Sequence, residues 1–364
     1  MSLLYKPDWE KTMENYKAWW AGEDFGRCAI RVTARKAGTE HMQPPKKPDK
    51  IEDRWLDHEY LHAKNEYEMQ TTFYGGEAFP IWSAGHPGWA GCKAMIGVPV
   101  ELRETTGWAK PIIAEGDLRD YDYRKFVPDF SSDLWKRIEA MHRFAVEESK
   151  GKCIPYVSAI GHTGDTLEAL RSGYQLLLDL VDDPEYVHEF EMHLIENVWQ
   201  PIYNRLYDIV KDGSFGGSST WMGIWGPGKT FNPSNDFTYM ISTDMYREIY
   251  LDALKRHMEM FDYSIYHVDG IEAFRHVDML CELDNLQGLQ ILPGDGKPSP
   301  LHFMDVLKKV QARGKNLHIT IPPHEVKTAL ENLSSKGLYI NTWARTEEEA
   351  KELIKLCERE SRFY

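Results

Sequence analysis

The sequence predicts an α/β protein of the (β/α)8 TIM-barrel class, formed as one domain over residues 1–364 with an N-terminal helical extension. Short apolar runs alternate with helical segments from residue 153 onward, which is typical of parallel βαβ units. No glycine-rich phosphate-binding fingerprint follows a predicted strand, which disfavours a doubly wound sheet. The length of 364 residues also fits a barrel with insertions.

The N-terminal third contains the helical extension and the first strand. Residues 9–23 predict an amphipathic helix with Trp19 and Trp20 on its apolar face, and a short strand follows over residues 28–32. A Pro- and Lys-rich loop comes next, then a helix over residues 53–72 and a candidate strand over residues 78–82. The Gly- and Pro-rich region from residue 85 to 122 does not predict a definite order of elements.

From residue 129 onward, strands and helices alternate regularly. Ser131 or Ser132 is expected to cap the first helix of this region, and Pro184 suits the first turn of a later one. The expected strands cover residues 153–158, 221–225, 264–268, 288–292, 317–321 and 338–342. The expected helices cover residues 131–150, 166–180, 184–210, 243–260, 273–280, 303–313, 323–333 and 346–359.

Composition disfavours several functional classes. The formal net charge of −14 disfavours a broad nucleic-acid-binding face, because phosphates repel such a surface. No apolar run approaches the roughly 20 residues that span a bilayer, and the N-terminus lacks the pattern of a secretion signal. The five cysteines are odd in number and never spaced as CxxC, so we expect free thiols and a reducing, cytoplasmic location.

Polar residues follow nearly every predicted strand, where barrel enzymes have their active sites. His267 and Asp269 are two apart on a strand, so both side chains point to the same side. Such a pair can bind a divalent metal, or the carboxylate can orient the imidazole as an acid or base. Alternatively, Asp269 caps the next helix and His267 is a hydrogen-bonded core residue. Asp295 is a third catalytic candidate, although its Gly-Asp-Gly setting is also good turn chemistry.

Other polar and aromatic residues near the strand ends are weaker candidates. The tryptophans at positions 221, 225 and 343 could line a site for a planar ligand, and core packing explains them nearly as well. For Asp165, capping of the helix that begins at residue 166 is the simpler interpretation. His318 could point inward or toward the helices, and His162 and His324 are further pocket candidates.

Four segments carry a resemblance to a known family. They are the helix-to-strand opening at residues 19–27, the segment at 164–185, the helix start at 236–250, and the strand end Tyr-His-Val-Asp-Gly at 266–270. Their order and spacing over most of the chain resemble the uroporphyrinogen decarboxylase superfamily, which also contains corrinoid-linked methyltransferases. The resemblance implies a (β/α)8 barrel with its site at the carboxyl ends of the strands.

Departures from the family pattern separate its two branches. The decarboxylases resemble this chain in Arg35-Lys36-Ala37-Gly38-Thr39, but their second substrate-binding arginine and a late Gly-His-Gly segment are missing here. The methyltransferases hold zinc with His-x-Cys and a later cysteine. This chain keeps His267 but has Asp269 at the place of that cysteine, so a metal, if bound, would have a harder His and carboxylate ligand set.

The resemblance therefore favours a corrinoid-dependent methyltransferase that moves a methyl group between a small methylated substrate and a corrinoid on a partner protein. A partner is implied because the chain has no Asp-x-His-x-x-Gly motif of its own. Two alternatives stay open: a cofactor-free decarboxylase of a tetrapyrrole or other carboxylated substrate, and a non-catalytic barrel. The sequence leaves open whether the chain forms a homodimer. The expected metal ligands, for zinc or another divalent ion, are His267 and Asp269, with Asp295 as the third catalytic residue. The expected substrate contacts are Arg35, Trp221, Trp225, Asp236, Gln290 and Trp343.

Overall fold

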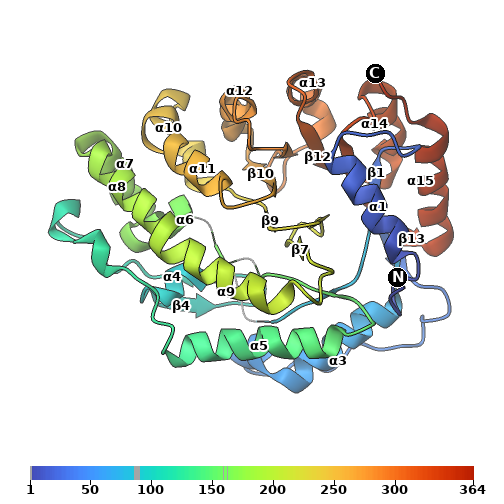
Figure 1. The fold of residues 1–364 in the computed structure, drawn as a ribbon, viewed down its shortest axis with the longest axis horizontal. Coiled ribbons are helices and arrows are strands. Elements are labelled where there is room, and N and C mark those ends of the chain that lie inside the picture. The colour runs from blue at the N-terminus through green and yellow to red at the C-terminus, as the bar shows by residue number, and fades with distance from the viewer. Residues whose placement is uncertain (1, 86–90, 159, 162) are drawn as a thin grey trace.

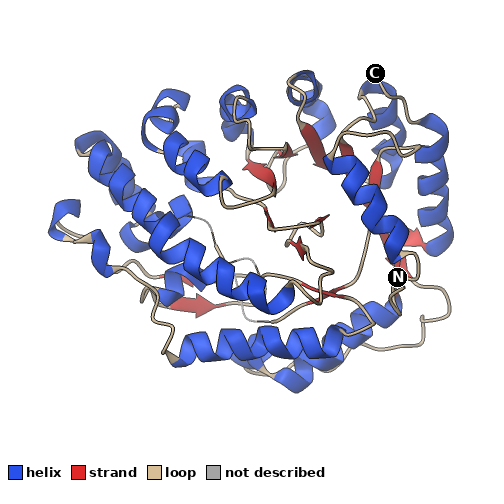
Figure 2. Cartoon of the chain, viewed as in Figure 1, coloured by secondary structure: helices blue, strands red, loops and turns tan. Residues whose placement is uncertain are grey.

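Helices surround a curled sheet in the computed structural model, which describes residues 2–85, 91–158, 160–161 and 163–364 (Figures 1 and 2). The main sheet has seven strands, in the order β2 (Thr72–Gly76), β1 (Ala29–Arg35), β13 (Leu338–Thr346), β12 (Asn316–Thr320), β11 (Gly288–Leu292), β10 (Tyr263–Asp269) and β9 (Thr230–Phe231). Every neighbouring pair is parallel except β1 and β2, which are antiparallel. The architecture is therefore mixed α/β with a parallel-rich sheet.

Three small sheets complete the described strands. They pair β3 (Ile81–Trp82) with β6 (Ile154–Pro155), β4 (Val100–Leu102) with β5 (Gly107–Ala109), and β7 (Ser218–Ser219) with β8 (Trp225–Gly226). Over the described ranges, these pairs do not join the main sheet through strand pairing. The observed sheet is therefore a curled arc of the TIM-barrel type, and the predicted closure into a complete eight-stranded barrel is not seen.

The outer ring consists of helices of 5 to 17 residues. They are α1 (Trp9–Trp20), α2 (Ile51–Leu56), α3 (His58–Thr71), α4 (Gly91–Met95), α5 (Asp133–Ser149), α6 (Thr163–Arg171), α7 (Gly173–Asp182), α8 (Pro184–His193), α9 (Gln200–Val210), α10 (Thr243–Ile249), α11 (Leu251–Met258), α12 (Val277–Cys281), α13 (Met304–Ala312), α14 (Val326–Asn332) and α15 (Glu347–Glu360). A π-helical turn, η4 (Leu194–Trp199), joins α8 to α9. The short 3-10 helices are η2 (Leu118–Asp120), η3 (Tyr123–Lys125), η5 (Asp236–Met240), η6 (Ile271–His276), η7 (Pro300–Phe303) and η8 (Pro323–Glu325).

Local capping chemistry sets several helix starts as predicted. Ser132 caps α5, because its Oγ accepts a hydrogen bond from the backbone N–H of Trp135 at 3.2 Å. Pro184 occupies the first turn of α8, where its missing N–H costs nothing, and Asp183 accepts from the N–H of Tyr186. The capping predictions for these two helices are confirmed.

Side chains on each strand alternate between two environments. On β1, Ile30 and Val32 are fully buried against the helices, whereas Arg31 between them points to the concave face of the sheet. The larger apolar core therefore lies between sheet and helices. A second, aromatic core fills the amino end of the concave face and includes Trp9 and Trp19 of α1.

Helix α1 covers the amino end of the sheet. The hydroxyls of Tyr16 and Tyr339 lie 2.9 Å apart, and Nε1 of Trp20 donates to the carbonyl of Trp225 at 3.0 Å. Figure 1 shows α1 running across this end near β12 and β13. Because bulky aromatic side chains occupy the amino end, the carboxyl end of the strands is left for a site.

Several sequence predictions of secondary structure are wrong. The expected strand over residues 221–225 is a turn between β7 and β8, because Gly223 adopts a φ of +69° and its N–H bonds to the carbonyl of Thr220. The expected helix over residues 166–180 is broken at Ser172, which has a φ of 77° and caps α7. The expected helix over residues 243–260 is divided at Tyr250 into α10 and α11, and the expected helix over residues 53–72 is divided at Asp57 into α2 and α3. The other strands and helices from residue 153 onward lie where predicted, within a few residues at their ends.

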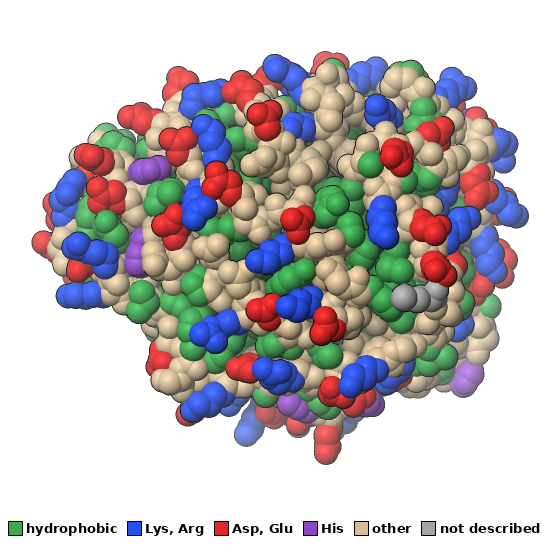
Figure 3. All heavy atoms as spheres, viewed as in Figure 1, with side chains coloured by type: hydrophobic (Ala, Val, Ile, Leu, Met, Phe, Trp, Pro, Cys, Tyr) green, Lys and Arg blue, Asp and Glu red, His purple; other side chains and the backbone are tan. Residues whose placement is uncertain are grey.

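Acidic and basic side chains are interspersed over the face seen in Figure 3, with no continuous basic patch on that face. Among the described helices, none is both long enough and apolar enough to cross a lipid bilayer. All five cysteines are free and buried, as the prediction of unpaired thiols requires.

Candidate metal and substrate site

A cavity of about 820 Å³ lies at the carboxyl end of the curled sheet. Its walls come from the segments that follow β9, β10 and β11 and from the start of α6, as expected for a barrel-type site. Its principal side chains are those of Lys93, Asp165, Glu168, Trp221, Asp236, Phe237, Tyr239, Met240, His267, Asp269, Asp295 and Lys297. The cavity thus combines an acidic wall with an aromatic one.

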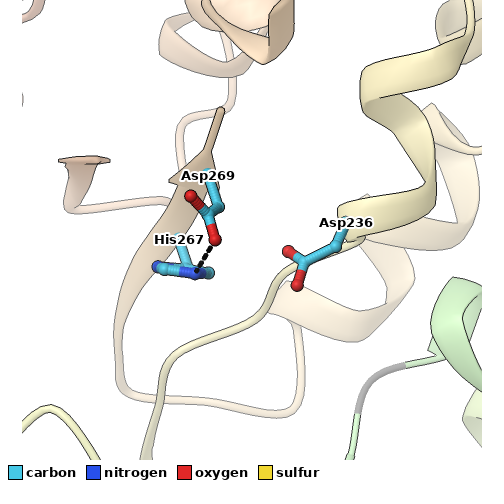
Figure 4. Close-up of side chains that lie close together, drawn as sticks. All are labelled: Asp236, His267 and Asp269. Atoms are coloured by element: carbon cyan, nitrogen blue, oxygen red, sulfur yellow. Dashed lines mark ion pairs between the residues drawn. The ribbon is translucent and has the colours of Figure 1, made fainter. Parts of the chain in front are cut away.

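Asp236, His267 and Asp269 form a compact cluster in this cavity (Figure 4). One ligand atom from each side chain lies within 4.8 Å of those of the other two. Nε2 of His267 is 3.7 Å from Oδ2 of Asp269, while Asp236 approaches from the opposite side. The sequence predicted the pair on β10, and the structure adds Asp236 from η5 as a third ligand candidate.

The segment before η5 is held against β10, which places Asp236 opposite His267. The backbone N–H of His267 donates to the carbonyl of Pro233 at 2.8 Å. One residue earlier in this segment, Nδ2 of Asn232 donates to the carbonyl of Ile265 at 3.2 Å. These two bonds fix the path of the chain just ahead of the carboxylate.

Gln290 on β11 orients the imidazole of His267. The two residues are register partners on adjacent parallel strands, and both side chains are buried. Nδ1 of His267 donates to Oε1 of Gln290, so Nε2 faces the two carboxylates. Trp221 closes the other side, with its ring edge-on to the imidazole at 5.1 Å between centroids.

The charges of the cluster shift its own ionisation. Burial acts to lower the pKa of His267, but the neighbouring carboxylate of Asp269, the charge of Asp236 and the hydrogen bond to Gln290 outweigh it, so this pKa is raised. The pKa of Asp236 is also raised, mainly because protein atoms crowd its carboxyl at the mouth of the cavity, although its side chain is solvent-exposed. The charge of His267 opposes this shift, and that of Asp269 adds to it.

Asp165 is a fourth acidic group at the cavity, and capping alone does not describe its environment. Burial, with the charge of Asp236, raises the pKa of its carboxyl to about 7. Its Oδ1 accepts from the backbone N–H of Phe237 at 3.2 Å, which ties α6 to η5. The two elements approach so closely that a Cβ at Gly164 would overlap the side-chain amide of Asn235. A carboxyl that titrates near neutral pH is suited to proton transfer.

Other predicted site residues lie in different settings. Asp295 is exposed and lines the cavity, outside the three-residue cluster. Arg35 donates to the hydroxyl of Tyr67 at 3.0 Å and to loop carbonyls, which anchors the loop after β1. Trp343 is 51% exposed near the carboxyl end of β13, on the concave face. The catalytic or binding roles assigned to these three residues stay predictions.

Trp225 lies away from the cavity, which corrects its placement at a ligand site. It is 1% exposed in the aromatic core below α1, and its Nε1 donates to the carbonyl of Ser214 at 3.0 Å. The turn at Gly223 reverses the chain, so Trp221 faces the cavity and Trp225 the amino end. His318 points to the concave face, stacked on Tyr339, and His162 lies outside the described residues.

The cluster has the donor set of a divalent metal site. It offers one imidazole nitrogen and two carboxylates, and Oδ1 of Asp269 is buried with no hydrogen-bond partner among the described residues. Nitrogen and oxygen ligands of this kind suit zinc, manganese or another hard to borderline ion. The bond from His267 Nδ1 to Gln290 is the supporting contact that metal-binding histidines usually have. The residues present therefore fit a metal, with no thiolate in the set.

Comparisons with known proteins bear on the fold. No protein-family model matches the chain, and no curated protein matches its sequence. Among solved structures, a methyltransferase from Methanosarcina mazei is similar, with a TM-score of 0.62 over 95% of this chain and 98% of that one. The chain shares that protein's fold. Because the two sequences are only 10% identical, the likeness extends to the architecture alone.

Proposed function

We propose that this protein is a methyltransferase that transfers a methyl group from a small methylated substrate to a corrinoid carried by a partner protein. The observation that carries the proposal is the cluster of Asp236, His267 and Asp269 at the carboxyl end of a TIM-type sheet. The resemblance of the strand end at residues 266–270 to methyltransferases of the uroporphyrinogen decarboxylase superfamily gives the reaction class. The fold shared with a methanogen methyltransferase supports the same choice.

In this proposal the three side chains hold one divalent metal. When bound, the metal would act as a Lewis acid on the heteroatom that bears the methyl group. His267 is oriented by Gln290, and the carboxylates of Asp236 and Asp269 neutralise the ion's charge. Asp165 would supply the proton that the demethylated heteroatom takes up as its bond to the methyl carbon breaks, because its pKa of about 7 keeps the protonated form available near neutral pH.

The aromatic wall suits an apolar methyl-bearing group. Trp221 is 39% exposed and Tyr239 is 46% exposed, although both are large apolar side chains, and both line the cavity. Side chains of this size at a cavity mouth gain from being covered, by substrate or by the face of a planar cofactor on a partner. A partner is part of the proposal because the sequence lacks a corrin-binding motif of its own.

The test combines metal analysis with a transfer assay. Purified protein would be loaded with zinc and its content measured by mass spectrometry. Methylation of cob(I)alamin would then be followed by absorbance with a panel of methylated amines, ethers and thioethers. His267→Ala should lose both the metal and the transfer. His62→Ala, which removes an imidazole on helix α3 outside the cluster, is the matched control and should keep both.

The same preparations separate the alternatives. Formation of coproporphyrinogen from uroporphyrinogen would favour a decarboxylase and contradict the methyl-transfer proposal. Zinc content that is equal in wild type and His267→Ala would contradict the proposed ligands. No activity in either assay, with a folded protein, would favour a non-catalytic barrel.

A further inference from the structure

Arg31 is a cation on the concave face whose donors are largely unused. Its β1 neighbours Ile30 and Val32 are 0% exposed and pack toward the helices, so the half-buried guanidinium receives its solvent from the concave side. Among the ion pairs of the described residues, none within 4.0 Å includes Arg31. Its Nε is buried and has no hydrogen-bond partner in the described part of the chain.

The guanidinium is held in place although it lacks a counter-charge. Its Nη1 donates to Oδ1 of Asn341 at 2.9 Å, and Nδ2 of Asn341 donates to Oγ1 of Thr320 at 3.1 Å. Gly223 leaves room for it, since a Cβ there would lie 2.9 Å from Nε of Arg31. The planar guanidinium group of Arg31 is therefore held in one orientation by two neighbouring strands and by the turn between β7 and β8.

A second unpartnered group lies beside it. His318 is 1% exposed, and neither ring nitrogen has a hydrogen-bond partner in the described residues. Burial, with the charges of Arg31 and of His267, lowers the pKa of His318 to about 3, so the ring is neutral. In the order of the main sheet, β12 with His318 lies between β1 with Arg31 and β10 with His267. Polar groups of this kind inside a protein normally have partners, so their absence points to a bound polar group.

The charges around the site would orient a bound substrate. The cavity is lined by six carboxylate side chains and by the two lysines Lys93 and Lys297, so its net charge disfavours an anion. Arg31 lies beyond His318, and the Trp221–Gly223 turn spans from the imidazole of His267 to the guanidinium. Arg31 and His318 are not among the described residues that line the cavity, so an anionic group would settle at Arg31 beside the Trp221–Gly223 turn, with the opposite end of the same molecule toward the cluster. A planar guanidinium fork pairs best with a carboxylate.

We infer that Arg31 is the carboxylate-binding residue of a substrate subsite, so that the substrate is a small methylated carboxylic acid. This inference rests on the proposed function only in placing the methylated end of the substrate at the metal cluster. The contact with the substrate carboxylate depends only on Arg31, Asn341 and their surroundings. Arg31 is thus a specificity-determining residue, separate from the groups that carry out the reaction.

Calorimetric titration tests the subsite with matched pairs of probes. The acids are N,N-dimethylglycine, methoxyacetate and (methylthio)acetate, and each is compared with its primary amide, which has nearly the same shape without the charge. At least one acid should bind ten or more times more tightly than its amide. In Arg31→Gln the ratio should fall to about one, while Arg143→Gln, on the outer helix α5, should keep the wild-type ratio.

Two further variants keep the test decisive. Arg31→Lys retains the charge but loses the fork, so an intermediate ratio is expected, and it replaces Arg31→Gln should that variant not fold. His267→Ala should keep the acid preference even after the metal is lost, which separates failure of the subsite from failure of the proposed function. Equal binding of acids and amides to wild type, absence of binding by all three acids at millimolar concentration, or an unchanged ratio in Arg31→Gln would overturn the inference.

Discussion

Replacement of Asp165 by asparagine should change how stability depends on pH. The carboxyl has a pKa of about 7 in the folded protein, against an ordinary value of 3.8, because protein atoms crowd this half-buried side chain and Asp236 faces it. A raised carboxyl pKa means that the folded state binds the proton more tightly than the unfolded chain. Its contribution to stability is therefore complete below about pH 4 and is lost as pH rises to about 7 and beyond.

The size of the effect follows from the two pKa values. Between pH 5 and pH 8 the difference in proton binding lowers the wild-type free energy of unfolding by about 2.5 kcal/mol through this group. The amide introduced by Asp165→Asn cannot ionise, yet its oxygen can still accept from the N–H of Phe237. The stability of Asp165→Asn relative to wild type should thus increase by about 2.5 kcal/mol over the same interval.

Urea unfolding followed by tryptophan fluorescence at pH 5, 6, 7 and 8, with EDTA present, measures this difference directly. Asp305→Asn, on an exposed position of α13, is the control and should follow the wild-type curve. Asp236→Asn should reduce the pH dependence, since it removes the neighbouring charge. Wild-type and Asp165→Asn curves that stay parallel from pH 5 to 8 would refute the reasoning.

Three other substitutions test the supporting structure. Gln290→Leu removes the acceptor for Nδ1 of His267, so zinc should bind about 10 to 100 times more weakly by competition with a chelator; an unchanged affinity would contradict the orienting role. Gly223→Ala places a Cβ at a φ of +69° and 2.9 Å from Arg31, so the free energy of unfolding should fall by about 1 to 2 kcal/mol and the acid preference should drop; retention of both would argue against the turn. Ser132→Ala should cost about 1 kcal/mol through loss of the α5 cap, with Ser131→Ala as the milder control, and equal losses would contradict the assignment.

Local sequence patterns predicted most of the fold because its strands are short apolar runs between helices, several of which begin at a capping side chain. The strands β10 and β11 were placed within one residue, and the capping residue of α5 was among the two proposed. The error at residues 221–225 has a physical cause. Trp-Met-Gly-Ile-Trp has the composition of a buried strand, and only the positive φ of its central glycine makes it a turn.

The candidate site could be predicted only in part. His267 and Asp269 are two residues apart, so strand geometry alone placed them together. Asp236 joins them from far earlier in the chain, through bonds between β10 and the segment before η5 that no local pattern encodes. Asp165 was interpreted as a helix cap, because its burial and its proximity to Asp236 depend on how α6 packs against η5.

Arg31 was missed for the same reason. An arginine between two apolar residues, as in Ile30-Arg31-Val32, is ordinary on a strand. The alternation of side chains predicts the face of the sheet to which Arg31 points, but it does not predict that the guanidinium lacks a charged partner. The signal was a charged residue flanked by two apolar ones on a strand that is otherwise buried. Only the tertiary structure shows that no acidic side chain among the described residues pairs with it.

The central claim is that one divalent metal is held by Asp236, His267 and Asp269. Anomalous diffraction at the zinc edge, from a crystal grown with zinc, tests it most directly. We predict one strong peak at bonding distance from Nε2 of His267 and from an oxygen of each carboxylate, lost in His267→Ala. A map with no peak there, or with zinc bound through cysteine sulfur or at surface carboxylates instead, would contradict the account.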